Sequence, residues 1–424
     1  MKQDSSVRSQ KTVVLAVAST FSALLLLGLP ALANPFSFST GDPDGLMATA
    51  SRPGPGPGSG ANQDTESADD FVLSNRTEIT TASFTGLVPA GVDLSNDISQ
   101  VRIEIYHVFP RDVITNRTIT VPTRANSPSD FEFDDRDSAS TSLTFTVTLL
   151  NPSFTVSNSV DMGIHPSPDQ RTLGEGPVTG QEVRFDVTFT TPLDLPADHY
   201  FFVPQVLVSD PDKHFLWLSA PKPIDLRGAP VSLDLQEWIR NADLDPDWLR
   251  VASDIIGNPP AFNATFSLAG DIPPHDLAVL AVKSPKVVKL KDGGPPLTKR
   301  VKVQIQNLSP HNETISNLTV LGELVSVTLS NIQGDGCLPP TAELIQGPPN
   351  KVPKTLGPNK KLNVFFNVTF DPEGCIPDKF RGEGHQDFGY SAHVDHAALD
   401  GNPDTNPSND TLDATVVTDV FLKR

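Results

Sequence analysis

Two runs of alternating apolar and polar residues lie on either side of the segment Gly-Asp-Ile-Pro-Pro at residues 270–274. The first run covers residues 262–269, and the second covers residues 275–282. Such alternation is typical of a β-strand with one buried face, whereas paired prolines interrupt a strand and stiffen the connection. We therefore predict a last strand, a spacer and a first strand here, with two domains, residues 34–270 and residues 271–424, meeting at Gly270.

Similar short runs recur along the chain, and turn residues separate them. They cover residues 35–40, 67–73, 77–87, 101–109, 142–150, 182–190, 199–208 and 214–218 before the spacer, and residues 299–307, 318–329, 362–370, 390–394 and 413–421 after it. The chain also contains 40 prolines and 28 glycines, which argue against long helices. This pattern predicts an all-β protein, and for the first half it predicts a sandwich or jelly roll.

Two segments of the first half depart from the strand pattern. Residues 52–60 read Arg-Pro-Gly-Pro-Gly-Pro-Gly-Ser-Gly, which cannot supply a regular hydrogen-bonded ladder, so we expect a flexible loop. Ser232 can cap residues 233–240, whose apolar side chains fall roughly on one helical face. One short helix is therefore expected at that position.

Residues 1–33 have the features of a secretory signal peptide. Basic residues precede an apolar run at residues 13–29, and Ala-Leu-Ala at residues 31–33 is a small-x-small cleavage pattern. The alternative, an uncleaved membrane anchor, requires a longer run of about 20 apolar residues. We expect cleavage, no membrane span in the mature chain, and a location that is secreted, cell-surface or periplasmic.

The net charge of −19 belongs mainly to the first half. Residues 34–270 contain 14 basic and 32 acidic residues, a net −18, whereas residues 271–424 contain 15 and 18, a net −3. Nucleic acids and anionic lipids bind basic clusters, so this charge argues against both as partners. It is compatible with solubility or with calcium binding.

The two cysteines, Cys337 and Cys375, lie 38 positions apart in the second half. In an oxidising compartment an isolated pair most simply forms one disulfide, which would stabilise the fold by about 4 kcal/mol on the chain-entropy model. A redox pair is the alternative, but the C-x-x-C spacing that lowers a thiol pKa is absent.

Short motifs resemble two kinds of bacterial exported domain. The motifs Ala-Asp-Asp-Phe at residues 68–71, Phe-Thr-Gly at residues 84–86 and the closing run at residues 262–270 are similar to jelly-roll-like domains of proteins of the PEP-CTERM type, over residues 36–270. The strand order after Gly270, with Leu-Gly-Pro at residues 356–358, resembles the CARDB-type domain over residues 271–412. This second resemblance implies an immunoglobulin-like sandwich and a role in adhesion. Cysteine-bearing insertions near residues 331–353 and 371–389 depart from the CARDB pattern.

Two groups of residues could bind a metal. Asp400, Asn402, Asp404 and Asn406 place oxygens at alternate positions, as calcium loops do, although an Asx-rich turn gives the same pattern. His385, His393, Asp395 and His396 could bind zinc, but on a strand His396 would point away from His393 and Asp395. Ordinary surface histidines are the alternative.

The three tryptophans, Trp217, Trp238 and Trp248, lie close together in the sequence. Exposed together they could stack on sugar rings, whereas their apolar neighbours favour burial in a core. Catalytic templates such as Gly-x-Ser-x-Gly and His-Glu-x-x-His are absent. We therefore expect a non-catalytic extracellular interaction or adhesion protein whose partner is a protein or glycan. Carbohydrate binding by the tryptophans and a secreted hydrolase with an acidic site are the alternatives.

Overall fold

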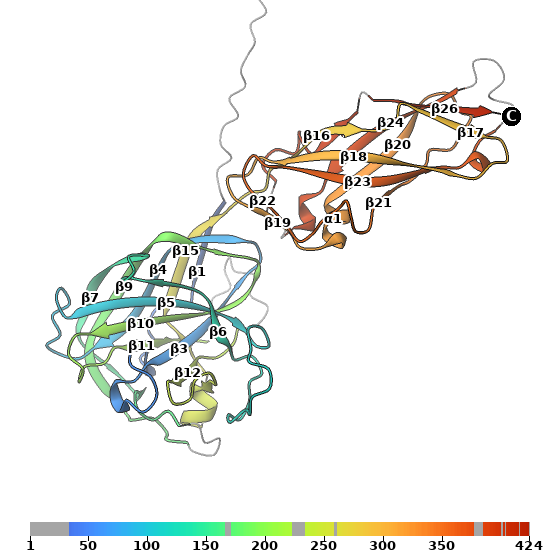
Figure 1. Ribbon diagram of the computed structural model, residues 1–424. Helices are drawn as coiled ribbons and strands as arrows, with labels where there is room; N and C mark the ends of the chain where they lie inside the picture. Colours follow the sequence, from blue (N-terminus) through green and yellow to red (C-terminus); the bar gives the residue numbers. More distant parts are fainter. Residues whose placement is uncertain are drawn as a thin grey trace, which may run out of the picture. The chain divides into compact units, whose positions relative to one another are not determined.

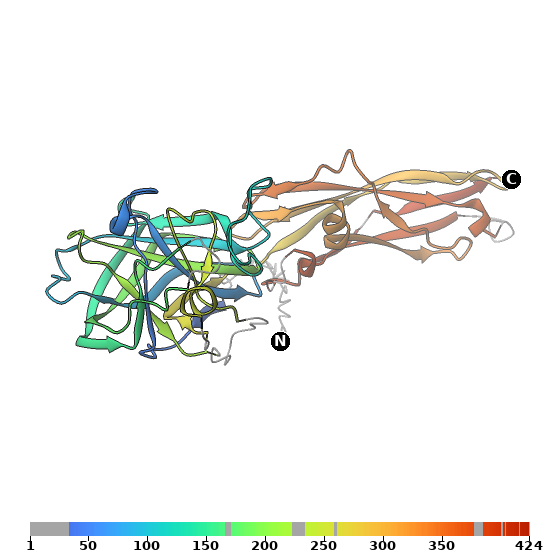
Figure 2. The same ribbon diagram turned by 90° about the horizontal axis from the view of Figure 1, so that it is seen from below.

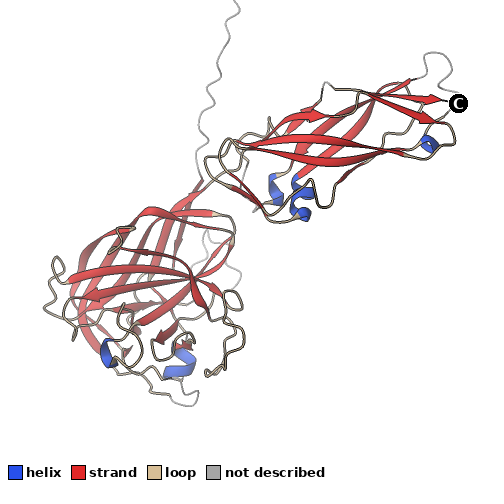
Figure 3. Ribbon diagram, viewed as in Figure 1, coloured by secondary structure: helices blue, strands red, loops and turns tan. Residues whose placement is uncertain are grey.

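The computed structural model describes residues 34–165, 171–222, 234–257, 261–376, 385–399, 402, 404–414 and 416–423. The expected signal peptide lies outside the described residues, as do Ser232, Leu233 and Asp400. Strands dominate the described chain, and only short helical segments interrupt them (Figure 3). The all-β sandwich prediction is confirmed.

Two sheets are built from the strands that precede Pro273. Their strands are β1 (Asn34–Ser39), β2 (Met47–Ala50), β3 (Thr65–Leu73), β4 (Thr77–Val88), β5 (Ile98–Val108), β6 (Pro128–Asp137), β7 (Leu143–Val156), β8 (Asn158–Val160), β9 (Val178–Leu195), β10 (Asp198–Val208), β11 (Leu216–Ala220), β12 (Trp238–Asn241), β13 (Leu249–Arg250), β14 (Asn263–Ala264) and β15 (Phe266–Ile272). One sheet has the order β1-β15-β4-β11-β2-β8, with β9 beside β4, β7 beside β9 and β14 beside β11. The other has the order β13-β12-β3-β10-β5-β6 (Figure 1). We call this body, residues 34–272, the N-terminal sandwich.

The core of the N-terminal sandwich lies between its two sheets. Alternate residues of β4 and β9, such as Phe84 and Phe185, pack from one sheet with stacked rings whose centroids are 4.9 Å apart. Phe202 of β10 packs from the other sheet against Phe266, with ring centroids 4.9 Å apart. Alternation within each strand thus provides the apolar face that each sheet buries.

The strand β10 is buried on both faces, which explains its nearly continuous apolar sequence. Phe202 and Val206 point into the main core, whereas Phe201 and Val203 join a second cluster on the opposite face. That second cluster includes Trp238 of β12 and Trp248, which precedes β13, so these two side chains cover part of the outer face of the sheet.

The strands after Pro274 form their own sheets. They are β16 (Leu277–Lys283), β17 (Val287–Lys291), β18 (Leu297–Asn307), β19 (Glu313–Ile315), β20 (Val325–Gln333), β21 (Ala342–Leu344), β22 (Lys354–Leu356), β23 (Lys361–Phe370), β24 (His385–Val394), β25 (Thr411–Asp413) and β26 (Thr418–Lys423). One sheet has the order β16-β18-β23-β21 and another has the order β17-β26-β24-β20, with β25 beside β24; β19 pairs with β22. Figure 2 shows the long strands of this body running along its length. We call residues 275–423 the C-terminal sandwich.

The core of the C-terminal sandwich follows the predicted alternation. Val301, Val303 and Ile305 of β18 are fully buried, as their two-residue spacing indicates. The predicted disulfide between Cys337 and Cys375 is present, and both cysteines belong to this core. Every described sheet is confined to one sandwich, while the division into independently folding domains at Gly270 remains a prediction.

Two local predictions are wrong. The helix expected at residues 233–240 is replaced by β12, because Trp238 pairs with Ala68 of β3 and with Arg250 of β13. Residues 318–329, expected as one strand, begin with helix α1 (Leu318–Leu324) before β20. The side chain of Asn317 caps this helix by accepting a hydrogen bond from the Val320 amide at 3.0 Å.

Candidate functional site

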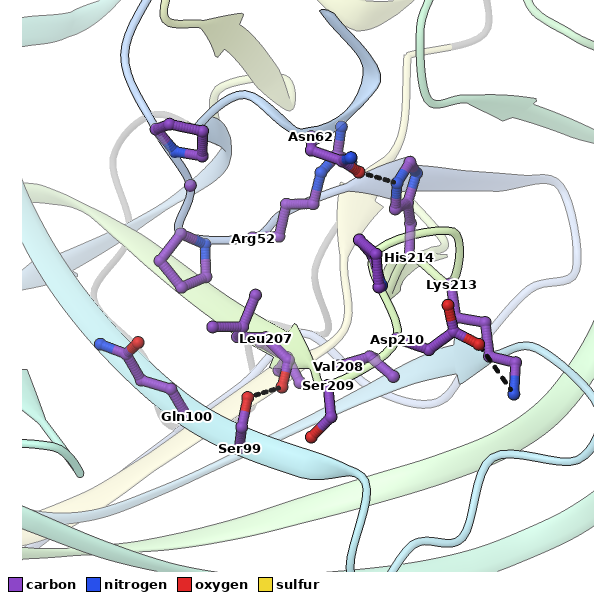
Figure 4. A pocket seen from close by; sticks show the side chains of 15 residues that line it. Arg52, Asn62, Ser99, Gln100, Leu207, Val208, Ser209, Asp210, Lys213 and His214 are labelled. Atoms are coloured by element: carbon purple, nitrogen blue, oxygen red, sulfur yellow. Dashed lines mark hydrogen bonds and ion pairs between the residues drawn. The ribbon is translucent and has the colours of Figure 1, made fainter. Parts of the chain in front are cut away.

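A pocket of about 690 Å³ lies beside the proline- and glycine-rich loop of the N-terminal sandwich. Its lining includes the loop residues 52–55, Asn62, Ser99, the end of β10 at residues 206–208, and His214. Figure 4 shows apolar side chains from β10 on one side of this space and polar side chains around it. We call it the loop pocket.

Three strand ends bring two polar side chains of the loop pocket, Arg52 and His214, together with Asp161 beside it. Arg52 follows β2, Asp161 follows β8, and His214 precedes β11. The strands β2 and β8 are parallel neighbours, and β11 is antiparallel to β2. The C-terminal ends of β2 and β8 and the N-terminal end of β11 therefore lie side by side at the same end of the strands. Residues far apart in the sequence therefore meet at the pocket.

His214 belongs to a network of polar contacts at these strand ends. Its Nδ1 lies 2.8 and 2.9 Å from the two carboxylate oxygens of Asp161, and its Nε2 lies 3.3 Å from Oδ1 of Asn62. Arg52 donates a hydrogen bond of 2.9 Å to the same Asp161 carboxylate. Because a carboxylate only accepts hydrogen bonds, Nδ1 of His214 carries a proton. The ring orientation is thus fixed, and Nε2 is the nitrogen turned toward Asn62 beside the pocket.

The contacts among Arg52, Asp161 and His214 oppose the effect of burial on the pKa values of Asp161 and Arg52. Burial alone would raise the pKa of Asp161, but the hydrogen bond from His214 and the charge of Arg52 hold that pKa below its usual value. Burial also lowers the pKa of the Arg52 guanidinium, and the Asp161 charge counteracts this effect. Asp161 is therefore an ionised anchor that orients both basic side chains.

A second pocket, of about 620 Å³, is lined by another part of the same loop and by the outer face of the other sheet. Its walls include Glu66 of β3, Arg102, Glu104 and Tyr106 of β5, and Arg240 of β12. Alternate residues of adjacent strands point to the same face, which explains their convergence. We call it the charged pocket.

Two arginines organise the charged pocket. Arg240 makes two hydrogen bonds of 3.0 Å to the Glu66 carboxylate and donates one of 2.9 Å to the hydroxyl of Tyr106. Arg102 lies 2.6 Å from Glu104, whose other oxygen accepts a hydrogen bond from Tyr106 at 3.2 Å. The carboxylates thus belong to one connected network of hydrogen bonds and ion pairs.

Burial shifts the acid–base behaviour of this pocket. Burial, with a smaller contribution from the Glu66 charge, raises the pKa of Asp64 to about 6. The same two causes raise the pKa of Glu104 well above its usual value. Carboxyl groups that hold their protons near neutral pH can donate them to a bound molecule, which makes this pocket a candidate for acid–base chemistry.

The residues predicted to bind zinc are not brought together. His393 is exposed and contacts the hydroxyl of Thr411, with Nδ1 2.9 Å away, while Asp395 caps a short helical turn by accepting from the Ala397 amide. His396 is buried and lies near Asp404 and Asp410 instead. The side chain of His385 lies outside the described residues. Of the described side chains in the predicted zinc set, His396 alone lies in a group of potential metal ligands, and zinc binding by this set stays a prediction.

The predicted calcium residues form turn contacts. Asn402 donates a hydrogen bond of 2.7 Å to the Pro273 carbonyl, and Asp404 accepts one of 3.1 Å from the Asn406 amide. Asn406 in turn accepts a hydrogen bond from Ser408. Asp404 alone of these residues lies in a described group of potential metal ligands, with His396 and Asp410, and Asp400 lies outside the described residues.

Sequence reasoning missed a buried carboxylate in the C-terminal sandwich. Glu313 accepts a hydrogen bond of 2.6 Å from Ser309, and its oxygens lie 2.9 Å from Nδ1 of His275 and 3.1 Å from Nε2 of His311. Burial would raise the pKa of Glu313, but hydrogen bonds from His275 and His311 lower it well below its usual value. This network links the segment before β16 to β19 and is best explained as structural.

All three tryptophans are buried, which contradicts the sugar-stacking interpretation. Trp217 is 0% exposed, Trp238 1% and Trp248 2%. Trp217 donates a hydrogen bond of 2.8 Å to the Thr265 carbonyl, and Trp248 donates one of 3.1 Å to the Ser129 carbonyl. None of them presents a ring face to solvent, so they fill the core.

Comparison with known proteins adds no family assignment. No protein-family model matches the chain, and no similar sequence is found among curated proteins. In the described part of the chain, no helix is long and apolar enough to cross a membrane.

Proposed function

We propose that the protein is an exported interaction protein whose N-terminal sandwich binds a polar extracellular ligand, a glycan or a protein segment, in the loop pocket. The observation that supports this proposal is that polar side chains with a fixed orientation and apolar side chains line the same pocket. His214 and Asn62 lie on one side, and Leu207 of β10 lies on the other. Binding sites for small ligands combine these two features in the same way.

The size and construction of the loop pocket support the proposal. Its volume of about 690 Å³ is within the range of ligand sites, which is roughly 300–1,000 Å³. One wall belongs to a proline- and glycine-rich loop, while the opposite wall belongs to β10 at the centre of its sheet. Rigid strands with an adaptable loop suit a site that recognises ligands by contact.

Filling the loop pocket is expected to weaken ligand binding without affecting the fold. Ser209 lines the pocket and is exposed, so Ser209→Trp places a large side chain in the ligand space at little cost in stability. The measurement is binding of the chain over residues 34–424 to a glycan array and to cell-wall fractions, with and without calcium. We expect the affinity for any ligand that binds to fall by at least about tenfold, or about 1.4 kcal/mol.

The matched control is Ser140→Trp, which adds the same side chain at an exposed turn that lines neither pocket. It should bind as the native chain does. Equal binding by the native chain and Ser209→Trp would show that the ligand contacts another surface.

The charged pocket supports a second candidate function, a secreted hydrolase with an acidic site. The specific observation is that burial raises the pKa of Glu104 well above its usual value, next to the ion pair of Arg240 and Glu66. A buried neutral carboxyl group next to ionised ones is the arrangement that general acid catalysis requires.

Under this second candidate, Glu104→Gln should remove hydrolysis of chromogenic glycosides and esters. The glutamine keeps the shape of the side chain but cannot donate a proton to a leaving group. The expected loss in kcat is at least about a hundredfold, with KM nearly unchanged, measured between pH 4 and 8. A native chain that hydrolyses none of these substrates, or a variant as active as the native chain, would reject the candidate.

A further inference from the structure

Several buried side-chain oxygen atoms of the C-terminal sandwich accept no hydrogen bond from the described residues. The carboxylates of Asp404 and Asp410 each have a buried oxygen, Oδ2 and Oδ1 respectively, that accepts no hydrogen bond from the described residues. Asp410 is only 7% exposed, and potential ligand atoms of Asp404, Asp410 and His396 all lie within 4.8 Å of one another. Two carboxylates held this close and away from water repel each other unless a positive charge, either a shared proton or a cation, lies between them.

His396 does not supply that positive charge. The backbone amide of Leu277 donates a hydrogen bond of 2.8 Å to Nε2 of His396, so this nitrogen must present its lone pair to Leu277. The ring is therefore neutral with its proton on Nδ1, which lies 3.7 Å from Oδ1 of Asp410. With one nitrogen occupied and the other protonated, His396 is also a poor metal ligand, and the available donors are oxygens.

Asn409, which precedes Asp410 in the sequence, has another buried side-chain oxygen. Its Nδ2 donates a hydrogen bond of 2.8 Å to Oδ1 of Asp276, which fixes the amide with its nitrogen toward that carboxylate. The carbonyl oxygen Oδ1 of Asn409 is consequently turned the other way, and it is buried without a donor among the described residues. Within the same part of the chain, no lysine or arginine forms an ion pair with Asp276, Asp404 or Asp410.

We propose that Asp404, Asn409 and Asp410 bind a calcium ion, with Asp276 positioning the Asn409 amide. Carboxylate and amide oxygens are the ligands that calcium prefers, and calcium tolerates the irregular geometry of a loop whose remaining ligands are water. An oxygen-only donor set disfavours zinc, which selects nitrogen and sulfur. This set shares only Asp404 with the four residues that the sequence pattern suggested.

Calcium titration of the chain over residues 34–424, after removal of divalent ions with a chelator, tests the proposal. Isothermal titration calorimetry should show one calcium site with a Kd of about 0.1–1 mM, the range of extracellular calcium modules. Calcium should also raise the thermal unfolding midpoint, whereas magnesium and zinc at equal concentration should raise it less.

Two substitutions locate the ion. Asp410→Asn keeps the side-chain shape, removes one charge and relieves the repulsion with Asp404, so the variant should fold and should bind calcium at least about tenfold more weakly. The matched control is Asp413→Asn, an exposed aspartate on the adjacent strand β25, which should leave the Kd unchanged. Asp404→Asn should reproduce the effect of Asp410→Asn.

Either of two results would overturn the proposal. Calcium binding that is equal in Asp410→Asn and the native chain would place the ion elsewhere. Failure of the native chain to bind calcium, with its circular dichroism spectrum showing a folded β protein, would mean that Asp404 and Asp410 share a proton and no metal.

Discussion

Replacing Glu237 by glutamine is expected to stabilise the protein by about 3–5 kcal/mol at pH 9 and to change its stability little at pH 4. Glu237 is only 1% exposed, and one carboxylate oxygen is 2.5 Å from the Thr49 hydroxyl. The other oxygen has no donor among the described residues. Burial, partly offset by the Thr49 hydrogen bond, raises the pKa of Glu237 to about 8. Glutamine has nearly the same shape and no charge, so it removes the penalty of ionising this group.

The sign of the effect follows from proton binding. The pKa of Glu237 rises from its ordinary 4.5 to about 8 on folding, so the folded chain keeps a proton that the unfolded chain releases between these pH values. Stability therefore falls as the pH rises from about 4.5 to about 8, and below about 4.5 both states are protonated. The glutamine variant lacks this contribution and should lose less stability over the same interval.

Chemical denaturation at a series of pH values measures the difference between the two chains. The matched control is Glu343→Gln, an exposed glutamate on β21, which should change the free energy of unfolding by less than about 0.5 kcal/mol at every pH. Parallel stability curves for the native chain and Glu237→Gln would show that folding does not raise the pKa of Glu237.

Sequence patterns predict the strands of this protein well where one face of the strand is buried. The alternation in β18 places Val301, Val303 and Ile305 in the core, as observed, because a strand turns successive side chains to opposite faces. The disulfide was also predictable, because two cysteines in a chain that is expected to be exported can form only one disulfide with each other. These inferences depend on local spacing or on residue counts.

The wrong prediction at residues 233–240 shows where local reasoning ends. Trp238 and Ile239 are adjacent and both buried, so β12 lacks the alternation that identifies a strand. Its conformation is set by pairing with β3, about 170 residues earlier, as the partners Trp238 and Ala68 show. Tertiary pairing of this kind cannot be read from a window of neighbouring residues.

The candidate sites could not be predicted for the same reason. Beside the loop pocket, Arg52 and His214 contact Asp161 across sequence separations of 109 and 53 residues.

The need for a glycine at position 86 could not be predicted either. In the sequence Gly86 is only part of a motif, whereas the structure shows why no larger residue fits there. A Cβ atom at this position would lie 2.1 Å from the ring of Phe215. Close approach of two strands, which the sequence does not reveal, requires the glycine.

Trp217→Ala is expected to lower the free energy of unfolding by about 3–5 kcal/mol, because it leaves a large cavity in the core of the N-terminal sandwich. The indole is fully buried, with its ring centroid 6.1 Å from that of Phe202 and 6.0 Å from that of Phe266. The substitution also deprives the Thr265 carbonyl of the indole hydrogen bond. The loss is a large fraction of the 5–15 kcal/mol that stabilises a typical domain.

Thermal and chemical unfolding of the variant distinguishes a core tryptophan from a ligand-binding one. The matched control is Leu149→Ala, on β7 of the same sheet, where the side chain is 45% exposed and truncation should cost less than about 1 kcal/mol. A tryptophan that stacked on sugars would give the opposite pattern, with glycan binding lost and stability retained. Because Trp217 has no exposed ring face, its replacement should weaken binding only through unfolding, and mild conditions that keep the variant folded should restore binding in full.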